Sequence, residues 1–431
     1  MYKCNPPEGM RDLLPQEMVL RNHVTKTILE IYNQYGFMQI ETPCAEKINF
    51  LSSGEGGENE KMLFKILKRG EKLNFSTTTK EIDVVDLGLR YDLTVPLSRY
   101  YASNHAKLPK NIKVIQIGNV WRAERPQKGR YRQFVQCDID IIGSSNVIAE
   151  VELILATSEA LRNLDFRNFR VRINDRRILV CLARYCDFEE NTFDKVFIIL
   201  DKLDKISIGG VREELEKSNF PTVSVDKFIS IITLVLEKKL ILDSLLKFLP
   251  NVPESVLEDL RFVINTVQQQ AENEYSIEFD LSLVRGMGYY TGQIFEIEVA
   301  GYKYSIAGGG RYDKMIGKFL QGKEDIPACG FSIGFERVVS ILKEQNFIVP
   351  QSKKKIALLY NENLTSFNHI LSLARELREK GNFVSLEVLK KKNTKKQIDA
   401  LSEYGYTSFA IFQNNEPLII KEINTSKNHT E

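Results

Sequence analysis

One stretch of the sequence, from Val120 to Gly143, decides how the rest of the chain is interpreted. It reads Val120-Trp-Arg-Ala-Glu-Arg-Pro-Gln-Lys-Gly-Arg-Tyr-Arg-Gln-Phe-Val-Gln-Cys-Asp-Ile-Asp-Ile-Ile-Gly143. Side chains two residues apart share one face of a strand, so the second half of this stretch predicts a strand with one polar face. The residues of that face are Phe134, Gln136, Asp138 and Asp140. A polar face in a cleft implies a ligand, although a solvent-facing hairpin with a charged tip would show the same pattern.

The first half of the stretch places Arg122 and Glu124 at the end of another predicted strand, before a basic loop. The planar fork of an arginine pairs bidentately with phosphate or carboxylate groups. The sequence has no G-x-x-x-x-G-K-[ST] loop, and Gly286-Met-Gly288 lacks the third glycine of a dinucleotide-binding loop. Any bound nucleotide would therefore be held by side chains.

The composition narrows the class of protein. A chain of 431 residues predicts two or three domains. With 59 Lys and Arg against 57 Asp and Glu, the net charge is +2, so a nucleic-acid partner would have to be bound by local patches. The six cysteines form no C-x-x-C pair and predict free thiols. No apolar run reaches 18 residues and the first 14 residues lack a signal core, so we expect a cytoplasmic protein that does not bind membranes.

Hydrophobic periodicity predicts an α+β fold. After Pro15, apolar residues at helical spacing predict a helix that ends at Gly36, and Phe37 to Pro43 predict an edge strand that could meet a second subunit. Strand-like runs follow, and their lengths favour an antiparallel sheet over regular βαβ units. They comprise short runs between Lys61 and Arg90, including Phe75 to Thr79, and the longer runs Ile112 to Val120, Gln133 to Gly143 and Phe295 to Ile306.

The same patterns divide the chain into four segments. We expect a first part of the catalytic core at 1–185, a helical insertion at 186–270, a second part of the core at 271–348 and a small α/β domain at 353–431. The insertion is predicted from apolar residues at helical spacing, namely Phe228, Ile231, Ile232, Val235 and Leu236. In the last domain, strands alternate with helices predicted at Leu364 to Lys380 and Lys395 to Tyr404. The tail after Asn424 predicts disorder.

The run from Arg122 to Asp140 resembles the second signature motif of class II aminoacyl-tRNA synthetases, in the form found in the histidyl-tRNA synthetase family. Further segments resemble that family in the same order: Pro6 to Pro15, Asn174 to Leu179, Asp201 to Lys205, Leu281 to Gly292, Ala307 to Asp313 and Cys329 to Arg337. The resemblance covers nearly the whole chain. Taken alone, several of these segments have simpler interpretations; Gly308 to Gly310 could form a bend, and Arg285 could cap a turn.

The resemblance implies a histidine–tRNA ligase with a class II catalytic core and an anticodon-binding type of C-terminal domain. Its catalytic residues would be Arg122, Arg285 and Arg337, with Arg285 at the α-phosphate in place of a second metal ion. Histidine would be bound by Asp92, Thr94, Arg122, Gln136, Asp140, Arg285, Tyr289 and Tyr290. ATP would be bound by Arg122, Glu124, Phe134 and Arg337, with Mg²⁺ as cofactor.

The resemblance also implies partners. Histidine tRNA would meet the basic loop at Arg125, Gln127, Lys128 and Arg130, and a homodimer is expected. A run of lysines in the C-terminal domain suits RNA but equally suits a solvated face; it comprises Lys390, Lys391, Lys392, Lys395 and Lys396.

Two features depart from the family pattern. Gly288 stands where an acidic residue usually precedes the tyrosine pair, and Phe409 to Asn414 replaces a strand that normally ends in glycine. The main alternative is a histidine-binding regulatory paralogue of the type that serves as accessory subunit of ATP phosphoribosyltransferase and does not charge tRNA. Such paralogues commonly lack the C-terminal domain and catalytic arginines, and this chain has both. A pure RNA-binding module would not need a face that holds Asp92, Gln136 and Asp140.

Overall fold

The computed structural model describes most of the chain. The described residues are 4–52, 62–76, 80–126, 130–237, 241–285, 288–302, 304–320, 324–350, 353–361, 363, 367–413 and 416–423. They form two compact units, one made of Met1–Arg11 with Val24–Gln345 and the other of Asp12–His23 with Asn346–Glu431. We describe each unit by itself.

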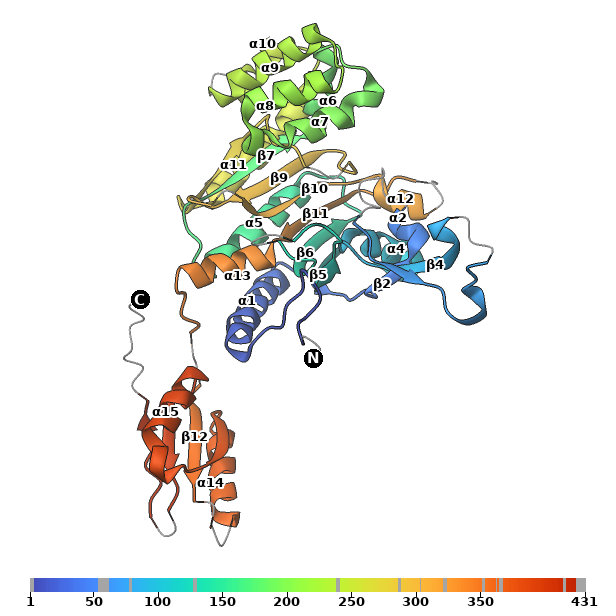
Figure 1. The fold of residues 1–431 in the computed structure, drawn as a ribbon. Helices are drawn as coiled ribbons and strands as arrows, with labels where there is room; N and C mark the ends of the chain where they lie inside the picture. Colours follow the sequence, from blue (N-terminus) through green and yellow to red (C-terminus); the bar gives the residue numbers. More distant parts are fainter. Residues whose placement is uncertain are drawn as a thin grey trace. The chain divides into compact units, whose positions relative to one another are not determined.

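The first unit is built on an eight-stranded sheet (Figure 1). Across the sheet the strands are β1 (Met38–Gln39), β5 (Ile112–Trp121), β6 (Gln133–Ile142), β11 (Ala328–Ile333), β10 (Ser305–Arg311), β9 (Gln293–Glu298), β7 (Phe169–Asp175) and β8 (Tyr275–Phe279). The pairs from β5 across to β7 are antiparallel, whereas β1 pairs with β5 and β8 with β7 in parallel. The predicted α+β class with an antiparallel sheet is confirmed, with parallel strands added at both edges.

The β5–β6 hairpin is the longest pairing in the sheet. Its register runs from Ile112 opposite Ile142 to Trp121 opposite Gln133, so the predicted strand pair is confirmed. The strand expected over Phe295 to Ile306 is wrong as a single element. It is divided between β9 and β10 by a turn at Gly301, whose φ of +87° lies in the left-handed region that favours glycine.

Helices pack against this sheet. They are α1 (Pro15–Gln34), α5 (Ile148–Arg162), α11 (Glu254–Gln270) and α13 (Phe335–Glu344). In α1 the residues at helical spacing, Val24, Ile28 and Tyr32, are buried, and the helix stops before Gly36, which has a φ of +79°. The predicted edge segment forms β1, at the border of the sheet.

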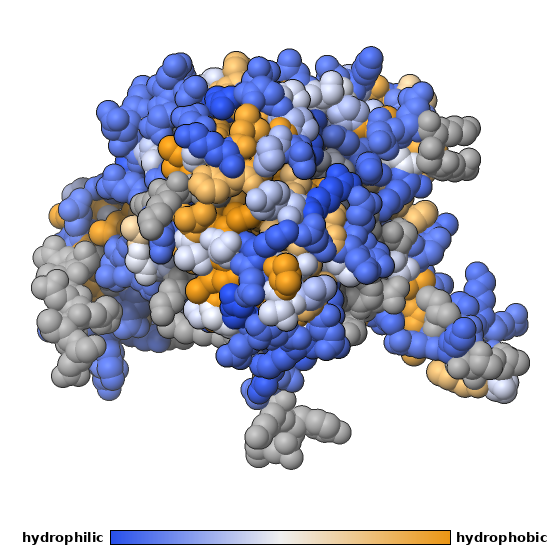
Figure 2. All heavy atoms as spheres, turned by 90° about the horizontal axis from the view of Figure 1, so that it is seen from above, coloured by the Kyte–Doolittle hydropathy of each residue, from blue (hydrophilic) through white to orange (hydrophobic). Residues whose placement is uncertain are grey.

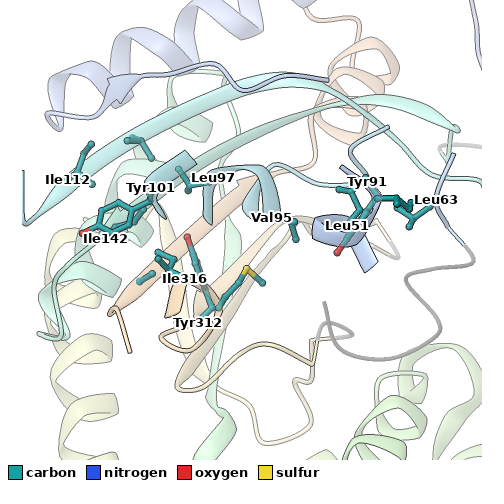
Figure 3. Packing of buried hydrophobic residues seen from close by; sticks show 14 of the residues in the cluster. Leu51, Leu63, Tyr91, Val95, Leu97, Tyr101, Ile112, Ile142, Tyr312 and Ile316 are labelled. Atoms are coloured by element: carbon teal, nitrogen blue, oxygen red, sulfur yellow. The ribbon is translucent and has the colours of Figure 1, made fainter. Parts of the chain in front are cut away.

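A second, three-stranded sheet lies beside the first, in the order β2 (Ala45–Lys47), β4 (Val85–Leu89), β3 (Lys65–Leu67). With α2 (Ile48–Ser52), α4 (Thr94–Asn104) and α12 (Met315–Phe319) it surrounds an apolar cluster, which extends along α4 in Figure 3. Tyr91 and Val95 are buried in this cluster, and Asp92 and Thr94 are thereby fixed at the start of α4. The strand expected from Phe75 is wrong: Phe75 and Ser76 lie outside any strand, and Thr77 to Thr79 lie outside the described residues.

The segment between β7 and β8 is helical. Its helices are α6 (Arg176–Tyr185), α7 (Phe193–Leu200), α8 (Leu203–Lys217), α9 (Thr222–Leu236), α10 (Leu245–Phe248) and α11, and α6 to α10 form one cluster in Figure 1. Phe228, Ile231 and Ile232 on α9 are buried, as their spacing predicts, but Leu236 at the end of the helix is exposed. The exact boundaries of an insertion stay a prediction.

The second unit contains a four-stranded sheet in the order β13 (Phe383–Val388), β12 (Lys355–Tyr360), β14 (Ser408–Ile411), β15 (Lys421–Glu422). Both neighbours of β12 pair with it in parallel, connected through α14 (Asn368–Glu379) and α15 (Thr394–Glu403). The helix predicted from Leu364 begins at Asn368, and residues 364–366 and the tail from Asn424 lie outside the described residues. The divergent segment that begins at Phe409 forms most of the strand β14.

Hydrophilic residues cover most of the face drawn in Figure 2, with apolar residues visible in its middle. Among the described residues, no helix combines the length and the apolar character that crossing a bilayer requires.

Candidate active site

A cavity of about 510 Å³ opens over the middle strands of the large sheet. It brings together most of the predicted site residues, which come from four separate stretches of the sequence. The predicted residues in its lining are Asp92, Thr94, Arg122, Glu124, Arg130, Phe134, Gln136, Asp140, Arg285, Tyr289, Tyr290 and Arg337. Arg125 is exposed and does not line the cavity, while Gln127 and Lys128 lie outside the described residues.

One end of the cavity holds three buried carboxylates, Asp92, Asp138 and Asp140, each at most 4% exposed. Burial raises the pKa of Asp92 to about 6 and that of Asp140 to about 7. Burial and the neighbouring Asp140 raise the pKa of Asp138 well above its usual value. This end of the cavity therefore favours a ligand that brings positive charge.

Asp92 and Asp140 are each anchored through one carboxylate oxygen. Asp92 Oδ1 accepts a hydrogen bond from the backbone N–H of Val95 at 3.1 Å, and Asp140 Oδ1 accepts one from the hydroxyl of Tyr312 at 2.6 Å. Gly330 makes room for Asp140, because a Cβ at position 330 would lie 2.0 Å from Asp140 Oδ1. The carboxylates are thus held at fixed positions by their surroundings.

Three acceptor atoms at this end are buried without a hydrogen-bond partner among the described residues. They are Asp92 Oδ2, Gln136 Oε1 and Asp140 Oδ2. The amide nitrogen of Gln136 donates to Ser332 Oγ at 3.2 Å, which leaves its oxygen as the unpaired atom. An unsatisfied buried acceptor costs about 1–3 kcal/mol, so this arrangement suits a ligand that supplies several N–H donors.

Arg285 lies over the sheet at the centre of the cavity. Its Nη1 donates to Glu296 on β9, and Gly308 on the neighbouring strand β10 lies opposite Glu296. A Cβ at position 308 would lie only 2.2 Å from Arg285 Nη1. The glycine run Gly308 to Gly310 is therefore part of a strand and not a bend, and its missing side chain gives the guanidinium its place.

Arginines and aromatic rings line the same cavity. The guanidinium carbon of Arg122 lies 5.1 Å from the centre of the Phe134 ring, and its Nε donates to the backbone oxygen of Tyr91 at 3.0 Å. Arg337, in the first turn of α13, lies 5.2 Å from the centre of the Tyr304 ring. Cationic and flat aromatic groups together can hold a planar base and phosphates.

The loop residues Glu124 and Arg130 form an ion pair of 2.5 Å. Tyr289 and Tyr290 stand next to each other with ring centres 4.7 Å apart, and Tyr290 is buried. Gly288, before this pair, is exposed. Among the described residues, no contact of Gly288 explains why it stands in place of an acidic residue.

Sequence reasoning missed several residues of the cavity. Alternation along the strand places Asp138 on the polar face but does not indicate its role. Tyr312 lies in the segment Ala307 to Asp313, which resembles the family, but the resemblance gave this tyrosine no role. Glu296 and Ser332 stand among apolar residues on their strands, so the sequence pattern does not indicate a role for them. Their signal is positional: Glu296 stands opposite Gly308, and Ser332 stands opposite Asp138, and only the register of the strands reveals both pairings.

The large sheet with its antiparallel centre and a cavity lined by arginines has the architecture of a class II aminoacyl-tRNA synthetase catalytic core. A family model described as histidyl-tRNA synthetase matches residues 9–338. The chain belongs to the histidyl-tRNA synthetase family.

Individual relatives are similar in sequence to this chain over most of its length. A histidine–tRNA ligase of Leifsonia xyli subsp. xyli is 40% identical over 436 aligned residues, which cover 97% of each chain. A histidine–tRNA ligase of Porphyromonas gingivalis is 36% identical over 88% of this chain and 86% of the relative.

Solved structures share the fold. Histidyl-tRNA synthetase from Nostoc sp. PCC 7120 matches with a TM-score of 0.78 and 26% identity, covering 99% of this chain and 96% of the other. A protein described as an ATP phosphoribosyltransferase regulatory subunit/histidyl-tRNA synthetase from Bacillus halodurans C matches with a TM-score of 0.73 at 23% identity, covering 96% of this chain and 100% of the other. The second match concerns the fold alone.

Proposed function

We propose that this chain is a histidine–tRNA ligase, which activates L-histidine with ATP and transfers it to the 3′ end of histidine tRNA. The observation that carries the proposal is the set of three unpaired buried acceptors in a cavity that Arg122, Arg285 and Arg337 also line. The curated relatives at 34–41% identity bear the name histidine–tRNA ligase or probable histidine–tRNA ligase. ATP and histidine are its substrates.

The acceptor end fits free histidine. The α-ammonium group supplies three N–H donors and a positive charge, and Asp92, Thr94 and Gln136 receive it. Asp140 and Tyr290 face the imidazole, one as acceptor and the other through its hydroxyl, with Tyr289 beside the ring. A rival amino acid without a ring N–H leaves buried polar groups unpaired, which gives strong discrimination.

The cationic groups of the cavity fit ATP. A carboxylate oxygen of histidine attacks the α-phosphorus in line, a new P–O bond forms, and the bond to the bridging oxygen breaks as pyrophosphate leaves. Arg122 neutralises the histidine carboxylate and the α-phosphate, and Arg285 stabilises the charge that develops on the α-phosphate. Arg337 holds the γ-phosphate, and Phe134 stacks on adenine while Glu124 contacts its amine. The attacking carboxylate is already ionised, so no general base is needed.

Mg²⁺ accompanies ATP in this proposal. Within the part of the chain that the structure describes, no group of three or more His, Cys, Asp or Glu side chains is gathered into a metal site. Mg²⁺ commonly binds through substrate phosphates and water with few protein ligands. The residues therefore fit a metal ion that is carried by the phosphates and neutralises their charge.

Histidine tRNA meets the basic loop through Arg125, Gln127, Lys128 and Arg130, and its anticodon meets the C-terminal domain. The lysine run of that domain, defined above, is exposed in full. The expected homodimer would use the edge strand β1 and α1. The enzyme is proposed to act in the cytoplasm.

The test is histidine-dependent exchange of pyrophosphate into ATP, followed by charging of a histidine tRNA transcript. We expect exchange with histidine and none with the other amino acids, and loss of exchange on Arg285→Ala while the protein stays folded. Absence of exchange in a protein that still binds histidine would select the regulatory paralogue instead.

A further inference from the structure

The N-terminal segment Glu8–Arg11 lies on the hairpin that joins β5 to β6. The backbone N–H of Arg132 donates to Gly9 O at 2.8 Å, and Arg132 Nε donates to Glu124 O at 3.0 Å. Gly9 has a φ of +78°, and a Cβ there would lie 2.7 Å from Arg132 Cγ. The segment is therefore closely fitted to the hairpin.

Arg11 extends this contact to two further elements. Its guanidinium carbon lies 4.5 Å from the centre of the Tyr131 ring, at the end of the hairpin. Its Nη2 also donates to Glu336 Oε2 at 3.1 Å, in the first turn of α13. The other oxygen of Glu336 accepts the backbone N–H of Val135 on β6 at 3.3 Å. One arginine thus joins the hairpin, β6 and α13.

The residues that Arg11 joins are the immediate neighbours of the groups assigned to ATP. Tyr131 and Val135 lie within three residues of Phe134 in the sequence, and Glu336 precedes Arg337 in α13; all three also line the cavity. A shift of α13 relative to the hairpin would move Arg337 relative to Phe134. The carboxylates of Asp92 and Asp140 are anchored independently through Val95 and Tyr312.

We propose that Arg11 is a positioning residue for ATP, which sets the spacing between the adenine-stacking Phe134 and the phosphate-binding Arg337. Arg11 acts through Tyr131 and Glu336 and does not touch the substrate. The inference rests on the proposed function, since that function assigns Phe134 and Arg337 to ATP. It predicts that loss of Arg11 weakens the use of ATP and spares the use of histidine.

The test compares Arg11→Met with Arg261→Met in the full-length protein. Arg261 is a matched control: it is exposed to a similar degree, 35% against 32%, and pairs with the carboxylates of Asp243 and Glu254. In pyrophosphate exchange we expect the KM for ATP to rise about tenfold in Arg11→Met, which corresponds to roughly 1.4 kcal/mol. The kcat and the KM for histidine should stay within about twofold, and Arg261→Met should match the wild type.

Two further variants distinguish positioning from general stabilisation. Arg11→Lys keeps the charge toward Glu336 but loses the planar group over Tyr131, so the KM for ATP should rise only about threefold. Glu336→Gln removes the negative charge that Arg11 faces and leaves one side-chain oxygen for two donors, Arg11 Nη2 and the N–H of Val135, so it should reproduce the ATP-specific effect; it carries the test if Arg11→Met fails to fold. Equal rises in both KM values, or no rise in the KM for ATP, would overturn the inference.

The proposed function can fail separately. If the wild type shows no exchange with histidine, the ligase assignment fails, and equilibrium dialysis of ATP then tests the inference directly. About tenfold weaker ATP binding in Arg11→Met than in Arg261→Met would still support a positioning role. Equal ATP binding in the two variants would overturn it.

Discussion

The substitution Gly308→Ala adds one methyl group at the place where Arg285 crosses β10. The new Cβ would lie 2.2 Å from Nη1, 2.6 Å from Cζ and 2.9 Å from Nη2 of Arg285, all closer than side chains approach each other. The clash falls on the end of a flexible side chain, so the guanidinium can swing away and the fold should tolerate the change. It must move by about 1 Å, and a displacement of that size can cost about 100-fold in rate, or about 2.7 kcal/mol.

The assay is pyrophosphate exchange at saturating ATP and histidine. We expect kcat to fall about 100-fold in Gly308→Ala, with a Tm close to that of the wild type. Gly209→Ala is the control, because a Cβ there meets only Ser207 Oγ at 3.9 Å, and it should leave exchange unchanged. A Gly308→Ala protein with the kcat of the wild type would refute the assignment of Arg285 to the reacting phosphate.

Three other predictions concern charge. The raised pKa of Asp140, about 7, means that the folded state binds its proton more tightly than the unfolded state between about pH 4 and 7, so stability is lost as pH rises through that window. Asp140→Asn should therefore stabilise the ligand-free protein at pH 8 by roughly 1–3 kcal/mol in urea unfolding while abolishing histidine activation; equal stability at pH 8 would contradict this. Glu150→Gln replaces the carboxylate that pairs with the buried Arg311 at 2.6 Å by a neutral amide, so that Asp313 at 3.2 Å stays as the ion-pair partner of Arg311. The change should cost about 3–5 kcal/mol in the same assay, whereas a cost below about 1 kcal/mol would show that the charge of Glu150 contributes little to stability. Changing the five lysines of the C-terminal run to glutamine should raise the KM for tRNA and weaken its salt dependence without affecting exchange; an unchanged KM would assign the run to a solvated face.

The sequence predicts the polar strand face reliably because alternation is a local property. Gln136 and Asp140 appear in the cavity as expected, since a strand has no other way to orient residues two apart. The long helix α1 was also predictable, from its apolar spacing and the glycine that ends it. Both predictions rest on interactions between residues close in the sequence.

The parts that could not be predicted depend on register across the sheet. The residues around Glu296 in the sequence do not indicate that it stands opposite Gly308 and pairs with Arg285. The sequence pattern also shows β9 and β10 as one apolar run and does not predict the turn between them. The same holds for Tyr312, whose hydroxyl reaches Asp140 from 172 residues away. Such contacts depend on how distant strands are ordered, which periodicity does not encode.

The family resemblance supplied roles that pattern alone left open, and the cavity gives those roles a common location. Arg122, Arg285 and Arg337 line one space although they are widely separated in the sequence. Their individual roles stay predictions, as do the tRNA contacts of the basic loop, where Gln127 and Lys128 lie outside the described residues.

Charging of tRNA by the purified protein tests whether the chain is a histidine–tRNA ligase. Purified protein is incubated with ATP, Mg²⁺, a histidine tRNA transcript and each labelled amino acid in turn, and label on the acid-precipitated tRNA is counted. We expect that histidine alone is transferred and that Arg285→Ala abolishes the transfer. Binding of histidine without any charged tRNA, or charging with a different amino acid, would contradict it.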